Sequence, residues 1–197
     1  VESCGYHGYW PDFALSEQVV VEPRLGHASD VDALIDVLES QDIAFMLDMI
    51  VNHAGYGARI EQERPTWFHQ GDGCEEMGNA DLICPLSGLP DFAQENEDVA
   101  AFVLELSRQW IQRFDIDGIR MDTAKHVPLE FFSSQWIPET RALDQDLFLL
   151  AEVFGGETPR LYQPFIDAGF DSAFNYALYG AFLEAFARDG STASVAE

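Results

Sequence analysis

The stretch IAFMLDMIV at residues 43–51 is almost continuously apolar. A strand that is buried on both faces, as in a parallel sheet covered by helices, requires such a run, so a buried strand is predicted here. Just before it, Val31, Leu34, Ile35 and Leu38 stand at positions i, i+3, i+4 and i+7, the spacing of one apolar stripe on a helix. A helix followed by a buried strand indicates a fold of repeated strand–helix units.

The same alternation returns after residue 95. A second amphipathic helix has Val103, Leu106, Trp110 and Phe114 on its apolar face and leads into a predicted strand at 116–121. Further strands are predicted at 6–10, 147–153 and 170–176, and further helices at about 128–143, at about 158–168 and after 176. Residues 54–95 contain Gly, Pro and Cys without a clear period, so an inserted loop subdomain is predicted there.

Strands separated by helices fit either a closed (β/α)8 barrel or an open doubly wound sheet. Polar side chains follow the apolar part of three predicted strands; they are Asp48, Asn52, His53, Arg120, Asp122 and Glu152. A barrel collects its catalytic groups at this end of its strands, whereas an open sheet would more often carry a glycine-rich phosphate loop, which the sequence lacks. We therefore predict an α/β fold, a partial (β/α)8 barrel, because a whole barrel needs about 250 residues. Residues 1–53 and 96–197 would supply about strands two to six, and the subdomain at 54–95 would follow the third strand.

The net charge restricts the partners. The chain has 35 acidic and 10 basic residues, a formal charge of −25. Such a surface repels nucleic-acid phosphates and anionic membranes, so no nucleic acid is expected as a partner and a neutral or cationic ligand is favoured. No apolar run approaches the ~20 residues of a membrane span, so membrane insertion is not expected either.

Four segments carry most of the polar and aromatic side chains that could bind a ligand. They are GYHGYW (5–10), LDMIVNH (47–53), DGIRMDTAKH (117–126) and AEVF (151–154), and LPD (89–91) and FNYALY (174–179) join them. In this order and spacing they resemble the α-amylase superfamily of glycoside hydrolases, and its calcium-dependent α-amylases most. The resemblance implies a barrel enzyme that cleaves internal α-1,4 bonds of starch-like glucans and retains the configuration at the anomeric carbon.

Retaining cleavage needs a carboxylate that attacks the anomeric carbon and a carboxylic acid that protonates the leaving oxygen, about 5 Å apart. The resemblance implies that Asp122 is the nucleophile and Glu152 the acid/base. Arg120 lies two residues before Asp122, so both point to the same face of a strand, where the guanidinium should favour the charged carboxylate. The apolar approach FLLA (148–151) should raise the pKa of Glu152 by desolvation. The alternatives are a structural salt bridge between Asp122 and Arg120 and a helix-capping role for Glu152.

The resemblance also implies residues that contact the sugar. The substrate-binding set is His7, Tyr9, His53, Arg120, Lys125 and His126. Tyr9 would supply a stacking face, since sugars are apolar on their faces and polar at their rims. Lys125 and His126 would contact the leaving-side glucose, with a solvated loop as the alternative. Asp48 is expected to support the floor of the site through hydrogen bonds.

A calcium ion is the expected cofactor. Asn52, Asp91 and the main-chain carbonyl of His126 resemble the family's set that fastens the inserted loop to the barrel, and calcium prefers oxygen ligands. Waters and one further carboxylate would have to contribute, and Asp81 is the candidate. The stretch between Cys84 and Asp91 is shorter than in the fungal-type α-amylases, which is a departure from the family pattern.

The chain has three cysteines, so at most one disulfide can form within it and one cysteine is left over. Cys74 and Cys84 flank a short polar stretch at 78–81, and a disulfide between them would hold a loop that has little apolar material of its own. Three free thiols in a cytosolic enzyme are the alternative. The disulfide, the calcium site and a polymeric substrate together favour an extracellular or periplasmic location.

The family's third carboxylate belongs to a His-Asp pair after the sixth strand, and the sequence has no His-Asp pair. The chain by itself is therefore expected to be inactive or nearly so, as part of a longer protein. Two alternatives stay open: a glucanotransferase that uses the same carboxylates, and a barrel that binds carbohydrate without cleaving it. The sequence does not indicate the oligomeric state, and its acidic surplus is compatible with a saline habitat.

Overall fold

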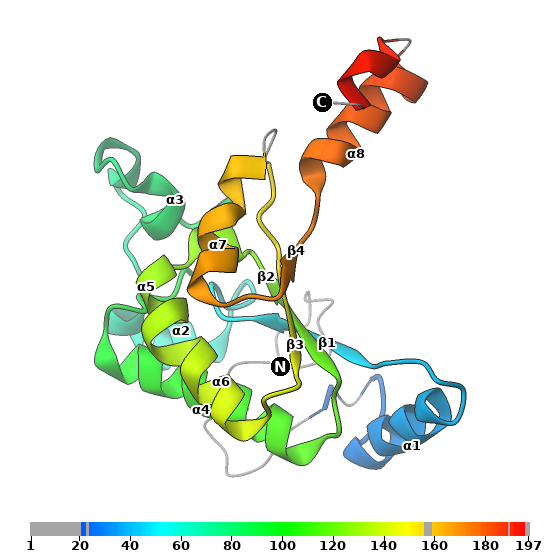
Figure 1. Ribbon diagram of the computed structural model, residues 1–197. Coiled ribbons are helices and arrows are strands. Elements are labelled where there is room, and N and C mark those ends of the chain that lie inside the picture. The colour runs from blue at the N-terminus through cyan, green and yellow to red at the C-terminus, as the bar shows by residue number, and fades with distance from the viewer. Residues whose placement is uncertain (1–20, 23, 156–158, 189, 196–197) are drawn as a thin grey trace.

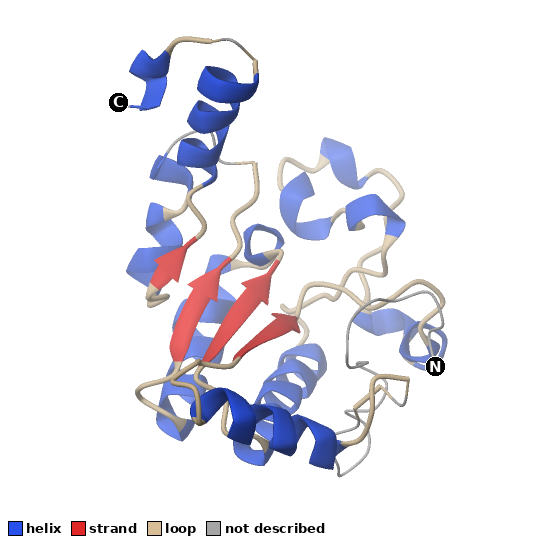
Figure 2. Cartoon of the chain, turned by 90° about the vertical axis from the view of Figure 1, so that its right-hand side faces the viewer, coloured by secondary structure: helices blue, strands red, loops and turns tan. Residues whose placement is uncertain are grey.

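The computed structural model describes residues 21–22, 24–155, 159–188 and 190–195. At its centre lies a parallel sheet of four strands in the order β1-β2-β3-β4 (Figure 2). The strands are β1 (Met46–Ile50), β2 (Gly118–Asp122), β3 (Phe148–Ala151) and β4 (Ser172–Ala173). Each strand pairs in parallel with the next one along the chain, and helices lie between them in sequence. The described residues thus form part of a (β/α)8 barrel, as predicted.

Eight α-helices are present in the described part of the chain (Figure 1). They are α1 (Ala28–Glu39), α2 (Arg59–Glu63), α3 (Ala80–Ile83), α4 (Glu97–Arg113), α5 (Leu129–Phe131), α6 (Ile137–Leu143), α7 (Gln163–Ala168) and α8 (Tyr176–Phe182). Short 3-10 helices span Pro65–Trp67, Cys74–Glu76, Leu86–Gly88, Ala124–His126, Pro159–Leu161 and Thr192–Val195, and π-helical turns span Phe132–Trp136 and Leu183–Ala187. Because α5, the first π-helical turn and α6 follow one another without a break, the helix predicted at about 128–143 is one helical run.

The strands are shorter than the sequence predicts. The apolar run at 43–51 pairs only over Met46–Ile50, because its partner β2 begins at Gly118 and the register places Met46 opposite that residue. The strand predicted at 170–176 is reduced to Ser172–Ala173, since Asn175 already caps α8 by accepting a hydrogen bond from the Leu178 amide. The strand predicted at 6–10 lies outside the described residues.

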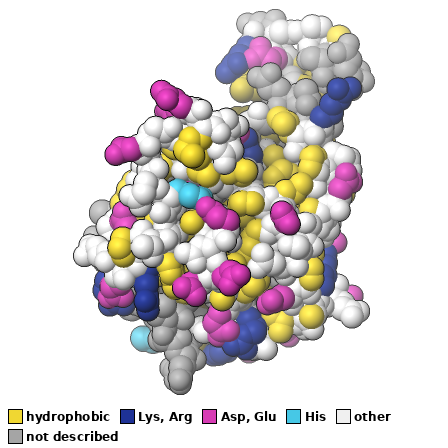
Figure 3. Space-filling view, turned by 90° about the vertical axis from the view of Figure 1, so that its left-hand side faces the viewer, with side chains coloured by type: hydrophobic (Ala, Val, Ile, Leu, Met, Phe, Trp, Pro, Cys, Tyr) yellow, Lys and Arg dark blue, Asp and Glu magenta, His cyan; other side chains and the backbone are white. Residues whose placement is uncertain are grey.

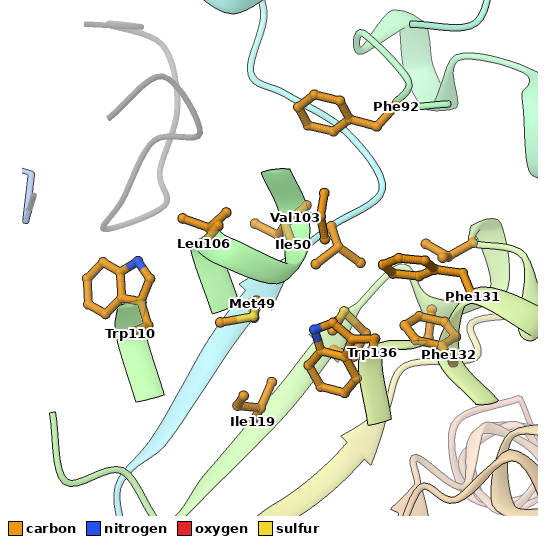
Figure 4. Packing of buried hydrophobic residues seen from close by; sticks show 14 of the residues in the cluster. Met49, Ile50, Phe92, Val103, Leu106, Trp110, Ile119, Phe131, Phe132 and Trp136 are labelled. Carbon is orange, nitrogen blue, oxygen red and sulfur yellow. The ribbon is translucent and has the colours of Figure 1, made fainter. Parts of the chain in front are cut away.

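Alternate residues of β2 face the helical layer. Ile119 and Met121 of β2 are fully buried, whereas Arg120 and Asp122 are only partly buried. The buried face packs against α4 and the first π-helical turn, whose Trp136 is fully buried in the same cluster (Figure 4). Burial on both faces was predicted for the strand within 43–51, and the consecutive residues Met49, Ile50 and Val51 at its end are all buried, whereas its start is more exposed.

The segment between β1 and α4 contains the predicted insertion. An antiparallel bridge between His53 and Asp91, and a hydrogen bond of 2.9 Å from the Ala54 amide to the Pro90 carbonyl, join its two ends at the sheet. A disulfide joins Cys74 and Cys84, whose Cα atoms are 5.5 Å apart, so the predicted pairing is confirmed. The boundaries drawn at 54 and 95 stay a prediction.

The surface agrees with the charge of the sequence. Acidic side chains are distributed over the face drawn in Figure 3, between apolar patches. Within the described ranges, no helix is long and apolar enough to cross a membrane.

Candidate active site

The strand pairing brings three acidic residues to the open face of the sheet. Asp48 on β1 stands opposite Arg120 on β2, and Asp122 follows Arg120 at the end of the same strand. Glu152 comes directly after β3, and its amide donates a hydrogen bond of 3.0 Å to the Met121 carbonyl, which extends the pairing by one residue. The carboxyl ends of parallel strands meet at one edge of a sheet, so these side chains lie together.

One guanidinium connects all three carboxylates. Nη1 of Arg120 lies 2.6 Å from Oδ1 of Asp48 and 2.6 Å from Oδ1 of Asp122, and Nη2 lies 2.6 Å from Oε1 of Glu152. The side chains of Asp122 and Glu152 are each 15% exposed, so these are ion pairs at a partly desolvated site. The prediction that Arg120 and Asp122 share a strand face is confirmed.

Glu152 has two further donors. The Thr123 amide lies 3.0 Å from Oε2 and the Tyr176 hydroxyl lies 3.0 Å from Oε1. Neither residue was selected from the sequence as a site residue. Tyr176 belongs to the segment FNYALY, which carried part of the resemblance, but nothing in its spacing from Glu152 indicates a contact across 24 residues.

The two carboxyl groups differ in pKa in the direction opposite to that expected. Burial raises the pKa of Asp122 to about 6, with a further contribution from the charge of Glu152, and Arg120 offsets this only in part. Burial also acts to raise the pKa of Glu152, but the Thr123 amide, the Arg120 charge, and hydrogen bonds from Tyr176 and with Asp122 outweigh it, so this pKa lies below its ordinary value. The apolar residues at 148–151 therefore do not determine the pKa of Glu152, because donors from other segments form hydrogen bonds with its oxygens.

The predicted sugar-contacting residues fall into three groups. His53 is buried, and its Nδ1 lies 3.3 Å from Nδ2 of Asn52. Lys125 lies 3.2 Å from the Asp81 carboxylate, and Nδ1 of His126 lies 2.8 Å from the Asp81 carbonyl oxygen. These two side chains therefore contact the insertion. The predicted residues His7 and Tyr9 lie outside the described part of the chain.

Aromatic rings surround the carboxylates. Arg120 lies over the ring of Phe174 at 5.8 Å, and Phe154 meets the ring of Tyr176 edge-on at 5.1 Å. Phe154 is 66% exposed and follows Glu152 by two residues. Exposed aromatic faces beside charged groups suit a ligand that is polar at its rim and apolar on its faces, and the sequence analysis missed Phe154 and Phe174 in this role.

The predicted calcium residues fit an oxygen site only in part. Asn52 and Asp91 are buried, and Oδ1 of Asn52 has no hydrogen-bond partner. Oδ2 of Asp91, however, lies 2.6 Å from Nδ1 of His69, whose Nε2 lies 2.8 Å from Glu95. Among the residues that the structure describes, no group of three or more His, Cys, Asp or Glu could hold a metal, so such a site would depend on amide and main-chain oxygens.

Comparisons with known proteins agree on one family. Residues 72–194 match the family model described as Alpha amylase, catalytic domain. The maltogenic alpha-amylase of Bacillus acidopullulyticus is 31% identical, over 85% of this chain and 30% of its own length. Alpha-amylase 2 of Schizosaccharomyces pombe is 28% identical, over 96% of this chain and 34% of its own length. The chain thus spans about a third of the length of these curated relatives.

Solved structures give the same result. The alpha-amylase from Geobacillus thermoleovorans, complexed with acarbose, has a TM-score of 0.85 and 33% sequence identity; the match covers 98% of this chain and 43% of that one. An Anoxybacillus alpha-amylase has a TM-score of 0.79 and 35% identity, and the match covers 89% of this chain and 38% of that one.

Proposed function

Since this chain belongs to the alpha-amylase family, we propose that it supplies the nucleophile and the acid/base of a retaining glycoside hydrolase that cleaves α-1,4 bonds in starch-like glucans. One observation carries the proposal: Asp122 and Glu152, from neighbouring strands, both contact the guanidinium of Arg120, each at 2.6 Å. Two carboxyl groups that contact the two terminal nitrogens of one guanidinium fit retention of the anomeric configuration, which needs about 5 Å between them, better than inversion, which leaves room for a water.

In the proposed reaction, Asp122 attacks the anomeric carbon while Glu152 donates a proton to the leaving oxygen, and water later displaces Asp122 with Glu152 as base. This requires Asp122 charged and Glu152 protonated. The pKa of Asp122 near 6 means that the free pair carries one proton at mildly acidic pH, on Asp122. We infer that a bound sugar, which excludes water from Glu152, raises the pKa of Glu152 and thereby moves that proton from Asp122 to Glu152.

The test is product analysis after a protein that contains this chain within a complete barrel is incubated with starch and with a linear malto-oligosaccharide. Maltose-sized products support hydrolysis, cyclic or longer products support the glucanotransferase alternative, and no change in the substrate supports a carbohydrate-binding barrel. Replacement of Asp122→Asn and of Glu152→Gln should each abolish cleavage, whereas Asp115→Asn, at an exposed aspartate near β2, should leave it unchanged. Activity that persists in Asp122→Asn would contradict the assignment of the nucleophile.

We further propose that the 197 residues alone cleave glucans slowly or not at all. A (β/α)8 barrel builds its site from eight strands, and four strands are described here. The assay should therefore be run on this chain and on any longer protein of which it forms part. Cleavage by the chain alone at the rate of a complete alpha-amylase would contradict this expectation.

Calcium is proposed as a structural ion held by Asn52, Asp91 and the main-chain oxygen of His126, where it would fasten the insertion to the sheet. The unpartnered oxygen of Asn52 supports this, because a buried acceptor without a donor is costly. The ion would compete with His69 for Asp91, and Asp81 could contribute only if its carboxylate left Lys125. The melting temperature, measured with calcium and with a chelator, tests the proposal: equal values would exclude the ion.

An extracellular or periplasmic location is proposed because the Cys74–Cys84 disulfide is stable in an oxidising compartment. A thiol titration of protein purified from its source, under denaturing conditions and without reductant, should find one free thiol for the three cysteines. Three free thiols would favour the cytosolic alternative.

A further inference from the structure

Three donors from different parts of the chain contact the carboxylate of Glu152. Its Oε2 accepts from the Thr123 amide at 3.0 Å, and its Oε1 accepts from the Tyr176 hydroxyl at 3.0 Å and from Arg120 at 2.6 Å. Arg120 also contacts Asp48 and Asp122, so it does not act on Glu152 alone. The Thr123 amide and the Tyr176 hydroxyl, in contrast, donate only to Glu152 among the hydrogen bonds of the described residues.

Thr123 adopts a conformation that threonine rarely takes. Its φ is 50° and its ψ is 31°, in the left-handed region, where a β-branched residue is strained by about 1–3 kcal/mol. Its hydroxyl oxygen is buried without a hydrogen-bond partner, so no hydrogen bond of the side chain offsets the backbone strain. What this backbone conformation provides is the direction of the amide, which points at Glu152 one residue after Asp122.

Tyr176 is held in place from several sides. It is the first residue of α8, whose start is fixed by the Asn175 side chain, an acceptor for the Leu178 amide at 2.9 Å. Its ring meets Phe154 edge-on at 5.1 Å and lies 5.9 Å from Phe174. Burial and the neighbouring Glu152 raise the pKa of Tyr176 to about 12, so the hydroxyl keeps its proton at neutral pH and works as a donor.

We propose that Thr123 and Tyr176 are positioning residues that fix the Glu152 carboxylate beside Asp122, and that the Tyr176 hydroxyl partners Glu152 in both of its protonation states. The proposal rests on the acid/base role assigned to Glu152 above. An amide and a guanidinium can only donate, so both favour the charged carboxylate alone. A hydroxyl donates to the carboxylate and can turn to accept from the carboxylic acid, so it supports Glu152 before and after it gives up its proton.

The charged groups that face Glu152 are Arg120, Asp122 and, through Arg120, Asp48. The substitution Tyr176→Phe leaves all of them in place and removes only one oxygen. The hydroxyl binds the charged carboxylate more strongly than the neutral acid, because a charge-assisted hydrogen bond is the stronger of the two, so its loss should raise the pKa of Glu152 by up to roughly one pH unit. Tyr179→Phe is the matched control, because Tyr179 lies on the same helix and is 60% exposed.

The experiment is a 13C NMR titration of the Glu152 side-chain carboxyl carbon in the full 197-residue chain, in the original sequence and in both variants. A raised pKa of Glu152 in Tyr176→Phe and an unchanged value in Tyr179→Phe are expected. No change in Tyr176→Phe, or the same change in both variants, would overturn the proposal.

A second measurement decides the case if Tyr176→Phe does not fold, as judged by circular dichroism. In Glu152→Gln the charged acceptor is gone, so the 13Cζ chemical shift of Tyr176 at neutral pH should change while that of Tyr179 stays the same. An unchanged Tyr176 signal would refute the contact. Neither measurement depends on glucan cleavage, so the positioning role and the proposed function can fail separately.

Discussion

The substitution Asp122→Asn should make the folded chain more stable at neutral pH. The carboxyl group of Asp122 has a pKa of about 6 in the folded chain because of burial and the nearby Glu152 charge, whereas an unfolded chain gives about 3.9. A group whose pKa is higher in the folded state stabilises the folded state fully at pH values below its unfolded-state pKa. This stabilisation is lost as the pH rises through its folded-state pKa. Asp122 therefore lowers the stability of the folded chain progressively between about pH 4 and pH 6.

The size of the effect follows from the two pKa values. Their difference converts to about 3 kcal/mol. The side chain is 15% exposed, and asparagine also gives up the charge of the contact with Arg120, so a gain of about 1–2 kcal/mol is expected above pH 7. Below pH 4, where Asp122 is protonated in both states, the two proteins should be equally stable.

Urea unfolding of the 197-residue chain at intervals from pH 4 to pH 8 measures this difference. Asp115→Asn, at an exposed position, is the control and should show no dependence on pH. If Asp122→Asn is instead destabilised at pH 8, the contact with Arg120 is a structural salt bridge, which is the alternative that the sequence left open. The account of Asp122 as a carboxylate destabilised by burial is then wrong.

Three further predictions concern stability. Thr123→Gly should stabilise the chain by about 1 kcal/mol in urea unfolding, because glycine adopts the left-handed conformation without strain and the buried hydroxyl is removed; a loss of stability would contradict this. Ser107→Ala should lower the free energy of unfolding by about 1–3 kcal/mol, because the buried indole N–H of Trp136 donates to the Ser107 hydroxyl at 2.8 Å and would lose its acceptor. The same unfolding assay measures this change, and an unchanged stability would mean that another acceptor replaces the hydroxyl. The melting temperature should rise with added sodium chloride, because salt screens the repulsion within a chain of formal charge −25, and a constant value would contradict this.

Local periodicity was enough to predict the part of the site that one strand carries. Arg120 and Asp122 are two residues apart, and side chains alternate along a strand, so their shared face followed from the spacing alone. The apolar runs likewise predicted parallel strands in chain order, although the ends of β1 and β4 depended on where their partners begin and end.

The sequence by itself indicated the family, the strand–helix order and the Cys74–Cys84 pair, because these depend on residue types at short or family-specific spacings, and it selected Asp122 and Glu152 as candidate catalytic residues. Only the tertiary structure showed which groups contact Glu152 and that burial raises the pKa of Asp122 while these contacts lower that of Glu152. A pKa depends on every donor and charge within a few ångströms. The donors on Glu152 come from the turn after β2 and the start of α8, which no periodic pattern relates to it and which chain packing brings together.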